Sequence, residues 1–127
     1  MLDNQDCVFC NLPAERIVQE GRECFVIRDA FPVTHLHTLI VPKRHVADYF
    51  DLFASERQEI EGLLQEQRKA IFDLDPTISG FNIGVNVGRD AGQTVFHVHI
   101  HLIPRRHGDV SEPRGGVRGV IPEKQQY

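Results

Sequence analysis

The segment from His97 to Ile103 constrains this chain most, because it alternates histidine with apolar residues. Successive side chains of a β-strand point to opposite faces of the sheet. His97, His99 and His101 would therefore share one face, and the apolar residues between them would share the other. The apolar face can bury against a core, whereas the imidazoles form a row of groups that titrate near neutral pH.

The pattern alone leaves three uses for this row. A half-buried strand that turns polar side chains to water is ordinary, although histidine is scarce on strands. A metal centre is the second use, but alternating side chains lie roughly 6.5–7 Å apart, so one ion would bind two of them more easily than three. The third is nucleophilic catalysis, in which one ring nitrogen attacks phosphorus while the other is held as a donor.

Composition narrows the classes of partner. The chain of 127 residues has a net charge of −4 with neutral histidines, which argues against a general DNA- or RNA-binding surface. No stretch approaches the roughly 20 apolar residues of a membrane-spanning helix. Residues 1–6 lack the basic region and the apolar run of a signal peptide. The 3 cysteines, with two in Cys7-x-x-Cys10, fit a reducing cytoplasm better than a secreted disulfide framework.

The rest of the chain predicts one long helix among short strands. Residues 55–74 carry apolar side chains at helical spacing, with Ser55 placed to cap the helix and Asp75-Pro76 placed to end it. Pro104 is expected to end the histidine strand. The other strands are expected at residues 16–19, 24–29, 37–41 and 81–87.

These elements predict an α+β fold with an antiparallel five-stranded meander sheet, one long helix and a short helical piece or turn at residues 7–12. From residue 105 onward, arginine and glycine replace apolar periodicity, which indicates an extended C-terminal tail. We therefore expect a single domain over residues 1–127, with a core at 1–104 and a tail at 105–127.

A turn of small and polar residues precedes the histidine segment. Gly88 and Gly92 permit the backbone to approach an anion closely. Three nearby side chains add neutral hydrogen-bond donors: Asn86, Gln93 and Thr94. These surroundings favour chemistry on a phosphate.

Several motifs in this order make the chain resemble the histidine triad (HIT) family. The family signature, His-φ-His-φ-His-φ-φ with φ apolar, is matched at every position of residues 97–103. The resemblance runs from Cys7 to Gln126, and residues 113–122 are similar to bacterial members described as dinucleoside polyphosphate hydrolases. The further matching motifs are residues 37–45, 86–88, 91–94 and 103–105.

The resemblance implies a HIT-like fold and a hydrolase of dinucleoside polyphosphates or nucleoside phosphoramidates. His99 would attack the α-phosphorus of a nucleotide, and water would hydrolyse the nucleotidyl-histidine to a nucleoside monophosphate. His97 and His101 would orient His99 and help to neutralise the phosphate, and His37 would approach the phosphate from an upstream strand. Family members need no metal for this step, because neutral donors are aimed at the developing charge.

The resemblance also assigns nucleotide-binding side chains. Asp29 falls where members bind the ribose hydroxyls. Phe9 and Ile27 fall where members line the base pocket, although ordinary core packing explains each of them equally well. Donors to the phosphate and the leaving group are implied at Asn86, Gln93 and Thr94.

A structural zinc site is implied by the N-terminal cysteine pair. Alone, the pair could be a redox pair or two small apolar residues, and a structural zinc ion needs about four ligands. HIT relatives with this pair, and the related galactose-1-phosphate uridylyltransferases, complete the set with two histidines. The ligands implied here are Cys7, Cys10, His45 and His97. Cys24 is expected to be a buried small hydrophobe.

Three features remain open. Bacterial members read Pro-Gly where this chain has His35-Leu36, so that loop is expected to differ, with His35 either a phosphate contact or an exposed accident. The resemblance implies a two-fold homodimer through the long helix and a strand, although the helix would equally pack on its own sheet. The arginines expected in the tail could contact a polyphosphate or could simply be solvated charges. They are Arg105, Arg106, Arg114 and Arg118.

Two other functions compete with hydrolysis. A nucleotidyltransferase or phosphorylase would use the same intermediate with another acceptor. A nucleotide-binding interaction module would bind without turnover, although such a module has no need of an intact nucleophile.

Overall fold

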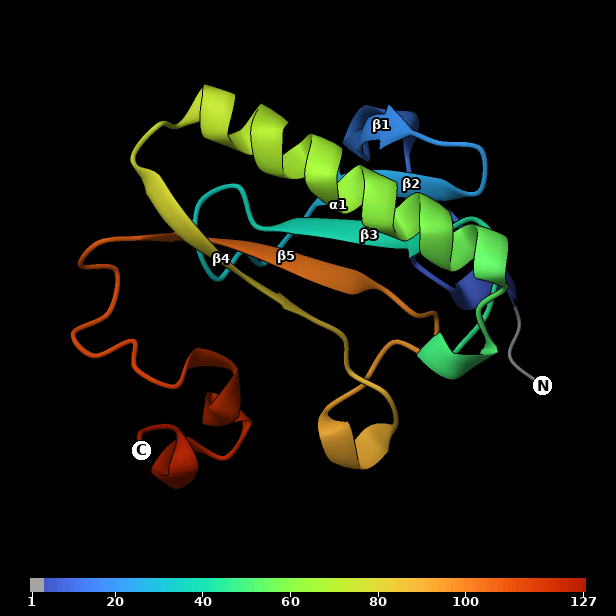
Figure 1. Cartoon of the computed structure of the whole chain (residues 1–127). Coiled ribbons are helices and arrows are strands. Elements are labelled where there is room, and N and C mark those ends of the chain that lie inside the picture. Colours follow the sequence, from blue (N-terminus) through green and yellow to red (C-terminus); the bar gives the residue numbers. More distant parts are fainter. Residues whose placement is uncertain (1–3) are drawn as a thin grey trace.

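The computed structural model describes residues 4–127, and it shows one sheet with one long helix across one face (Figure 1). All pairs of neighbouring strands are antiparallel. The helix is α1 (Ala54–Leu74), and the strands are β1 (Ile17–Glu20), β2 (Cys24–Arg28), β3 (Thr38–Pro42), β4 (Ile78–Gly84) and β5 (Ile100–Arg106). The expected α+β fold with a five-stranded antiparallel sheet is therefore confirmed.

The structure bears on the expectation about a membrane-spanning helix but only partly on the one about a signal peptide. In the described part of the chain, no helix is long and apolar enough to cross a membrane. The expectation about a signal peptide rests partly on residues 1–3, which lie outside the described residues. Residues 7–12 form a turn, and the shorter helical segments in residues 4–127 are all 3-10 helices.

The order of the last two strands departs from a simple meander. The first three strands follow one another, but β5 inserts between β3 and β4. The reason is that α1 carries the chain across the sheet to its far edge, so β4 lies outermost and β5 returns to the place beside β3 (Figure 1). The histidine-bearing strand is therefore flanked on both sides.

The alternation in the histidine segment divides two faces as expected. Val98, Ile100 and Leu102 are buried in clusters that include side chains of α1. Burial of each such side chain stabilises the fold by roughly 1.5–3 kcal/mol. His101 pairs with Leu39 of β3 and lies on the opposite, helix-free face, where Leu39 packs with Phe9.

The bounds of β4 and β5 differ from the predicted ones. β5 begins at Ile100, so His97 and His99 lie in the segment before it. β4 starts and ends earlier than the expected residues 81–87, because Gly84 pairs with His101 and β5 offers only Ile100 beyond that pair.

The prediction that Pro104 ends the strand is wrong. Pro104 lies within β5, opposite Phe81 of β4. The ladder to β3 reaches only as far as Leu102, so this side of β5 needs no N–H from a residue at position 104. The carbonyl of Pro104 instead accepts a hydrogen bond from Thr34 Oγ1 at 2.6 Å.

The prediction that Ser55 caps the helix is also wrong. The helix begins one residue earlier, with Phe53 at the N-cap position. Glu56 reaches back from the first turn, and its Oε1 accepts a hydrogen bond from the Phe53 N–H at 2.7 Å. Ser55 Oγ donates to Glu23 at 3.0 Å, which ties the helix start to the β1–β2 turn.

The C-terminal tail leaves the sheet after β5 and lies beneath the helix-free face (Figure 1). Its far end folds on itself in two short 3-10 helices, at Gly116–Val120 and Pro122–Lys124. The guanidinium groups of Arg114 and Arg118 lie 5.3 and 4.9 Å from the ring centroid of Tyr127. The tail is therefore held by contacts of its own rather than by apolar periodicity.

Leu36, in the loop before His37 that was expected to differ, has a strained backbone. Its φ is +71°, and no other non-glycine residue in the described part of the chain has a positive φ. A β-carbon in this region costs roughly 1–2 kcal/mol. The strained conformation is held because Leu36 packs against the cluster of Ile71 and Leu102, and its carbonyl accepts from Thr38 Oγ1 at 2.8 Å.

We predict that Leu36→Gly is more stable than Leu36→Ala by about 1 kcal/mol, because only glycine removes the strain. Both variants lose nearly the same packing, and elsewhere glycine is less stable than alanine by roughly 0.5–1 kcal/mol. Equilibrium unfolding in urea measures the difference. An alanine variant that proves the more stable of the two would contradict this account of Leu36.

Candidate active site and metal centre

Four metal-binding side chains meet beside the start of β5. Cys7 and Cys10 come from the N-terminal turn, His45 from the loop after β3, and His97 from the segment before β5. Cys10 Sγ lies 3.1 Å from His45 Nδ1, and Cys7 Sγ lies 3.4 Å from His97 Nδ1. All four candidate ligand atoms lie within 4.8 Å of one another. The structure thus brings together segments that are far apart in the sequence.

The spacing of these atoms fits a tetrahedral zinc ion. Zinc bonds of about 2.0–2.1 Å to nitrogen and 2.3 Å to sulfur place ligand nitrogens roughly 3.4 Å apart, and nitrogen and sulfur roughly 3.6 Å apart. The two Nδ1 atoms are 3.2 Å apart, and the nitrogen–sulfur separations are 3.1, 3.4 and 3.5 Å. His97 Nε2 lies 2.7 Å from the carbonyl of Pro42, so that nitrogen carries the proton and Nδ1 keeps its lone pair for a metal.

His99 is oriented by the backbone of the same segment. Its Nδ1 lies 3.0 Å from the carbonyl oxygen of His97. Because a carbonyl only accepts, Nδ1 carries the proton and Nε2 keeps a free lone pair. The ring centroid of His99 lies 4.9 Å from that of Phe9 and 5.1 Å from that of His101. His99 therefore stands between an aromatic wall and a second imidazole.

His37 and His101 form a hydrogen-bonded pair on the helix-free face. The N–H of Val33 donates to His37 Nδ1 at 3.0 Å, so His37 carries its proton on Nε2. That Nε2–H faces His101 Nδ1 at 2.9 Å and Asp29 Oδ2 at 3.4 Å. His101 Nδ1 is therefore an acceptor, which places the proton of His101 on Nε2.

Burial keeps this pair neutral. It lowers the pKa of His37, although the nearby Asp29 carboxylate partly offsets the effect. Burial, and then the neighbouring His99 and His37, lower the pKa of His101 to about 4. Both rings are therefore neutral at pH 7, and the hydrogen bonds described above are those of neutral imidazoles.

The two residues implied for a base pocket lie at different depths. Phe9 is 9% exposed, and its ring faces His97 and His99. Ile27 has no exposed surface and packs behind Phe9 with Leu39. Phe9 can therefore touch a ligand, whereas Ile27 supports the position of Phe9.

The three implied phosphate donors do not converge on one point. Asn86 lines a cavity together with His101. Thr94 is exposed and lines a separate hollow beside Cys7. Gln93 is buried and engaged with backbone, because its Oε1 accepts from the Gly88 N–H at 2.9 Å and its Nε2 donates to the carbonyl of Ala47 at 2.8 Å.

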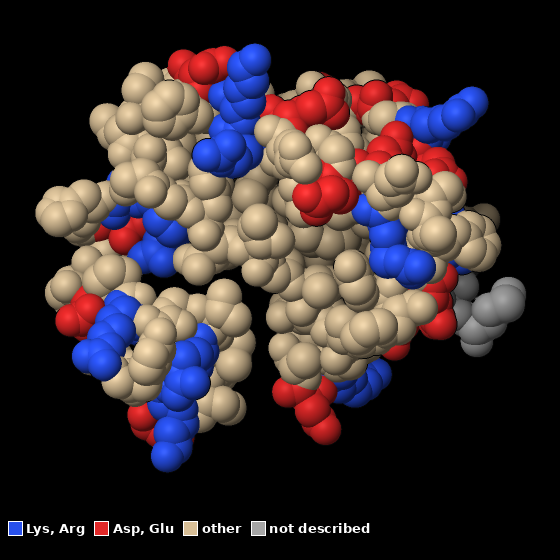
Figure 2. All heavy atoms as spheres, in the orientation of Figure 1, with Lys and Arg blue, Asp and Glu red and all other residues tan. Residues whose placement is uncertain are grey.

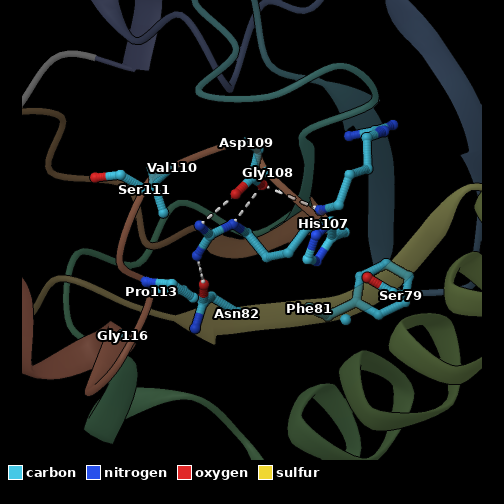
Figure 3. A pocket seen from close by; sticks show the side chains of 13 residues that line it. Ser79, Phe81, Asn82, His107, Gly108, Asp109, Val110, Ser111, Pro113 and Gly116 are labelled. Atoms are coloured by element: carbon cyan, nitrogen blue, oxygen red, sulfur yellow. Dashed lines mark hydrogen bonds and ion pairs between the residues drawn. The ribbon is translucent and has the colours of Figure 1, made fainter.

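Two of the arginines that the sequence assigned to the tail, Arg105 and Arg106, lie in β5, because the strand continues through Pro104, and both have partners within the chain. Arg105 donates to Asp109 at 2.8 Å and to Asn82 at 2.7 Å, as the dashed lines beside Asn82 and Asp109 show in Figure 3. Arg106 pairs with Asp75 at 2.9 Å and also donates to the carbonyl of His35 at 3.0 Å. The cavity of about 560 Å³ in Figure 3 thus has a guanidinium already neutralised on its wall.

One polar network that connects the helix to the site was missed in the sequence. Arg28 Nη1 donates to Thr38 Oγ1 at 2.7 Å and to Gln67 Oε1 of α1 at 2.8 Å. Because Thr38 Oγ1 also donates to the carbonyl of Leu36, the helix is connected to the residue before His37. The available signal was Gln67, an amide at a buried position of the apolar stripe of α1.

Comparison with known proteins identifies the family and the fold. The profile of the HIT domain matches residues 13–108. The crystal structure of a zinc-bound histidine triad family protein from Mycobacterium smegmatis is similar to this chain, with a TM-score of 0.76 and 36% identity. The match covers 87% of this chain and 82% of that chain.

Two further similar proteins have names that describe an activity. Adenylylsulfatase HINT3 from Arabidopsis thaliana is 35% identical over 109 residues, which are 82% of this chain and 54% of that protein. Plasmodium falciparum diadenosine triphosphate hydrolase, crystallised with Cyclomarin A, has a TM-score of 0.73 and 28% identity. That match covers 80% of this chain and 68% of the other.

Proposed function

The chain belongs to the HIT domain family, and on this premise we propose that it hydrolyses nucleotides at the α-phosphorus with His99 as the nucleophile. The observation that carries the proposal is the contact of His99 Nδ1 with the carbonyl of His97 at 3.0 Å, which leaves the lone pair on Nε2. The names adenylylsulfatase and diadenosine triphosphate hydrolase, borne by two similar proteins, support a substrate with an adenylyl group. Dinucleoside polyphosphates and nucleoside phosphoramidates are the proposed substrate classes.

The proposed reaction has two displacements at phosphorus. In the first, the lone pair of His99 Nε2 forms a bond to the α-phosphorus, and the bond from phosphorus to the leaving group breaks with its electron pair. In the second, water adds to the phosphorus, and the nitrogen–phosphorus bond returns its pair to Nε2. The proton lost by the water passes to the solvent. The products are a nucleoside monophosphate and the leaving group, which takes up a proton from the solvent where its basicity requires one.

The neighbouring residues would stabilise charge on the phosphate. His101 holds its proton on Nε2, because its Nδ1 accepts from His37, and this N–H is a neutral donor for a phosphate oxygen. Asp29 has one carboxylate oxygen engaged by the Phe31 N–H at 2.9 Å, and its other oxygen would accept from a ribose hydroxyl. Phe9 would contact the base, with Ile27 behind it. Of the three implied donors, Asn86 shares a cavity with His101 and would face the ligand. Gln93 would hold the turn through its backbone partners, and Thr94 lies in the separate hollow beside Cys7.

The metal centre would act on this site through His97. Zinc bound by the Cys7–Cys10–His45–His97 set would fix the N-terminal turn and the segment whose carbonyl orients His99. It would supply structural stability to the fold. Zinc thiolates need reduced cysteines, and cytoplasmic localisation stays a prediction that fits this need.

Replacing His99 by alanine should abolish turnover, because no other ring presents a free lone pair in the same way. We expect release of adenosine monophosphate from diadenosine tetraphosphate to fall at least about 1000-fold. Chromatography of the products measures the rate. His35→Ala is the matched control, because the His35 side chain is exposed, and it should keep activity within about twofold of the wild type. Equal activity of the wild type and the His99 variant would exclude the proposed intermediate.

Zinc content tests the metal centre directly. Protein purified without added metal should hold about one zinc ion per chain, and Cys10→Ser should lose most of it. The control is Cys24→Ala, which removes a buried thiol outside the cluster and should retain zinc. Atomic absorption on the three proteins decides the matter. A wild type free of zinc, or a serine variant with undiminished zinc, would rule out this ligand set.

We also propose a homodimer through α1 and the edge strand β4. Phe72 and Leu74 at the end of α1 are 47% and 65% exposed, and Ile83 of β4 is 52% exposed. A second copy would cover these apolar side chains. Phe72→Asp should weaken dimerisation at least about tenfold in sedimentation equilibrium. Val18→Asp on the opposite edge strand, 47% exposed, should leave it unchanged, and a monomeric wild type would disprove the proposal.

A further inference from the structure

A cavity of about 390 Å³ adjoins His101 on the helix-free face. Four parts of the chain line it: the loop before β3, β4 with the residues after it, β5, and the first 3-10 helix of the tail. Figure 2 shows the molecule hollowed by a deep cleft between the tail and the remainder of this side. The tail therefore forms one wall of a space that opens beside a site histidine.

Two glycines allow the tail to adopt the conformation that lines this cavity. Gly115 and Gly116 have φ of +87° and +40°, a conformation that other residues rarely adopt. A β-carbon on Gly115 would collide with the carbonyl of Gln125, and one on Gly116 would lie 3.2 Å from Asn82 Nδ2 of β4. These two glycines allow the tail to close on itself and to pack against the sheet.

The lining of the cavity suits a nucleobase. Val117 and Val120 present apolar side chains that are 61% and 77% exposed, and Val33 presents a third from the loop before His37. Asn86 adds an amide that can both donate and accept. Apolar walls with a few polar groups are typical of small-molecule sites, whose volumes run from about 300 to 1,000 Å³. A free phosphate would find no cation among the residues that line this cavity.

The sheet order places the cavity opposite the first base site. Phe9 packs over β2 and β3, whereas His101 lies on β5 and the cavity extends over β4. A phosphorus atom at His99 therefore has an aromatic wall on one side and this cavity on the other. From this arrangement we infer that the cavity binds the nucleoside of the leaving group, an inference that rests on the proposed function.

Gly84 offers a direct way to block the cavity. It lines the cavity and pairs with His101, so a side chain at position 84 would point to the same face as the imidazole. A β-carbon on Gly84 meets nothing within 4 Å, which means that the fold has room for a valine there. Gly80 is the matched control on the same strand and face, because its β-carbon would meet only Arg105 Cβ at 3.9 Å and it lies outside this cavity.

The experiment compares diadenosine tetraphosphate with adenosine tetraphosphate, which has the same phosphate chain but no second nucleoside. The preference is the ratio of kcat/KM for the two substrates. Gly84→Val should lower the preference about tenfold, and Gly80→Val should change it less than about twofold. A preference that Gly84→Val leaves unchanged, or that both variants lower equally, would overturn the inference.

A binding measurement separates this inference from the proposed function. In the His99→Ala background, calorimetry should show that diadenosine tetraphosphate binds more tightly than adenosine tetraphosphate, and that Gly84→Val removes the difference. Absence of turnover by the wild type would overturn the proposed hydrolysis but leave this binding result intact. Equal binding of the two nucleotides with Gly84 in place would overturn the cavity inference itself.

Discussion

The short ladder between β3 and β5 is the interaction on which the site depends. It consists of the pairs Thr38–Leu102, Leu39–His101 and Ile40–Ile100. His37 directly precedes β3, and these pairs bring its Nε2 to 2.9 Å from Nδ1 of His101. At the other end of β3, the carbonyl of Pro42 accepts from His97 at 2.7 Å. One ladder therefore fixes the histidine pair at one end and His97 of the candidate metal cluster at the other.

His97 belongs to the candidate metal cluster and also orients His99, the proposed nucleophile. The side chain of His97 faces the cysteines, while its backbone carbonyl faces His99 Nδ1. Any shift of the cluster would move that carbonyl and with it the direction of the free lone pair on Nε2. A purely structural ion would thus affect chemistry without contact with the substrate, as groups in an outer shell do in other sites.

The sequence was sufficient for features that follow from local pattern. The buried face of Val98, Ile100 and Leu102 and the long helix both came from periodicity, and the structure confirms them. Strand ends could not be predicted in the same way, because the end of β4 depends on where its partner β5 begins. The buried depth of Ile27 and the backbone partners of Gln93 likewise depend on tertiary neighbours rather than on residue type.

When a helix covers only one face of a sheet, apolar side chains on the other face need another segment to cover them. Here Phe9 of the N-terminal turn packs on that face over β2 and β3, and Val117 and Val120 of the tail line the cavity beside β4 and His101. Apolar side chains stand on both sides of the histidines: Phe9, which is nearly buried, and Val120, which is exposed and would be a liability on a plain surface. On either side of His99, they would suit the two bases of the proposed dinucleoside substrate. Because no helix covers this face of the sheet, the candidate site can have Phe9 on one side of His99 and the tail cavity on the other.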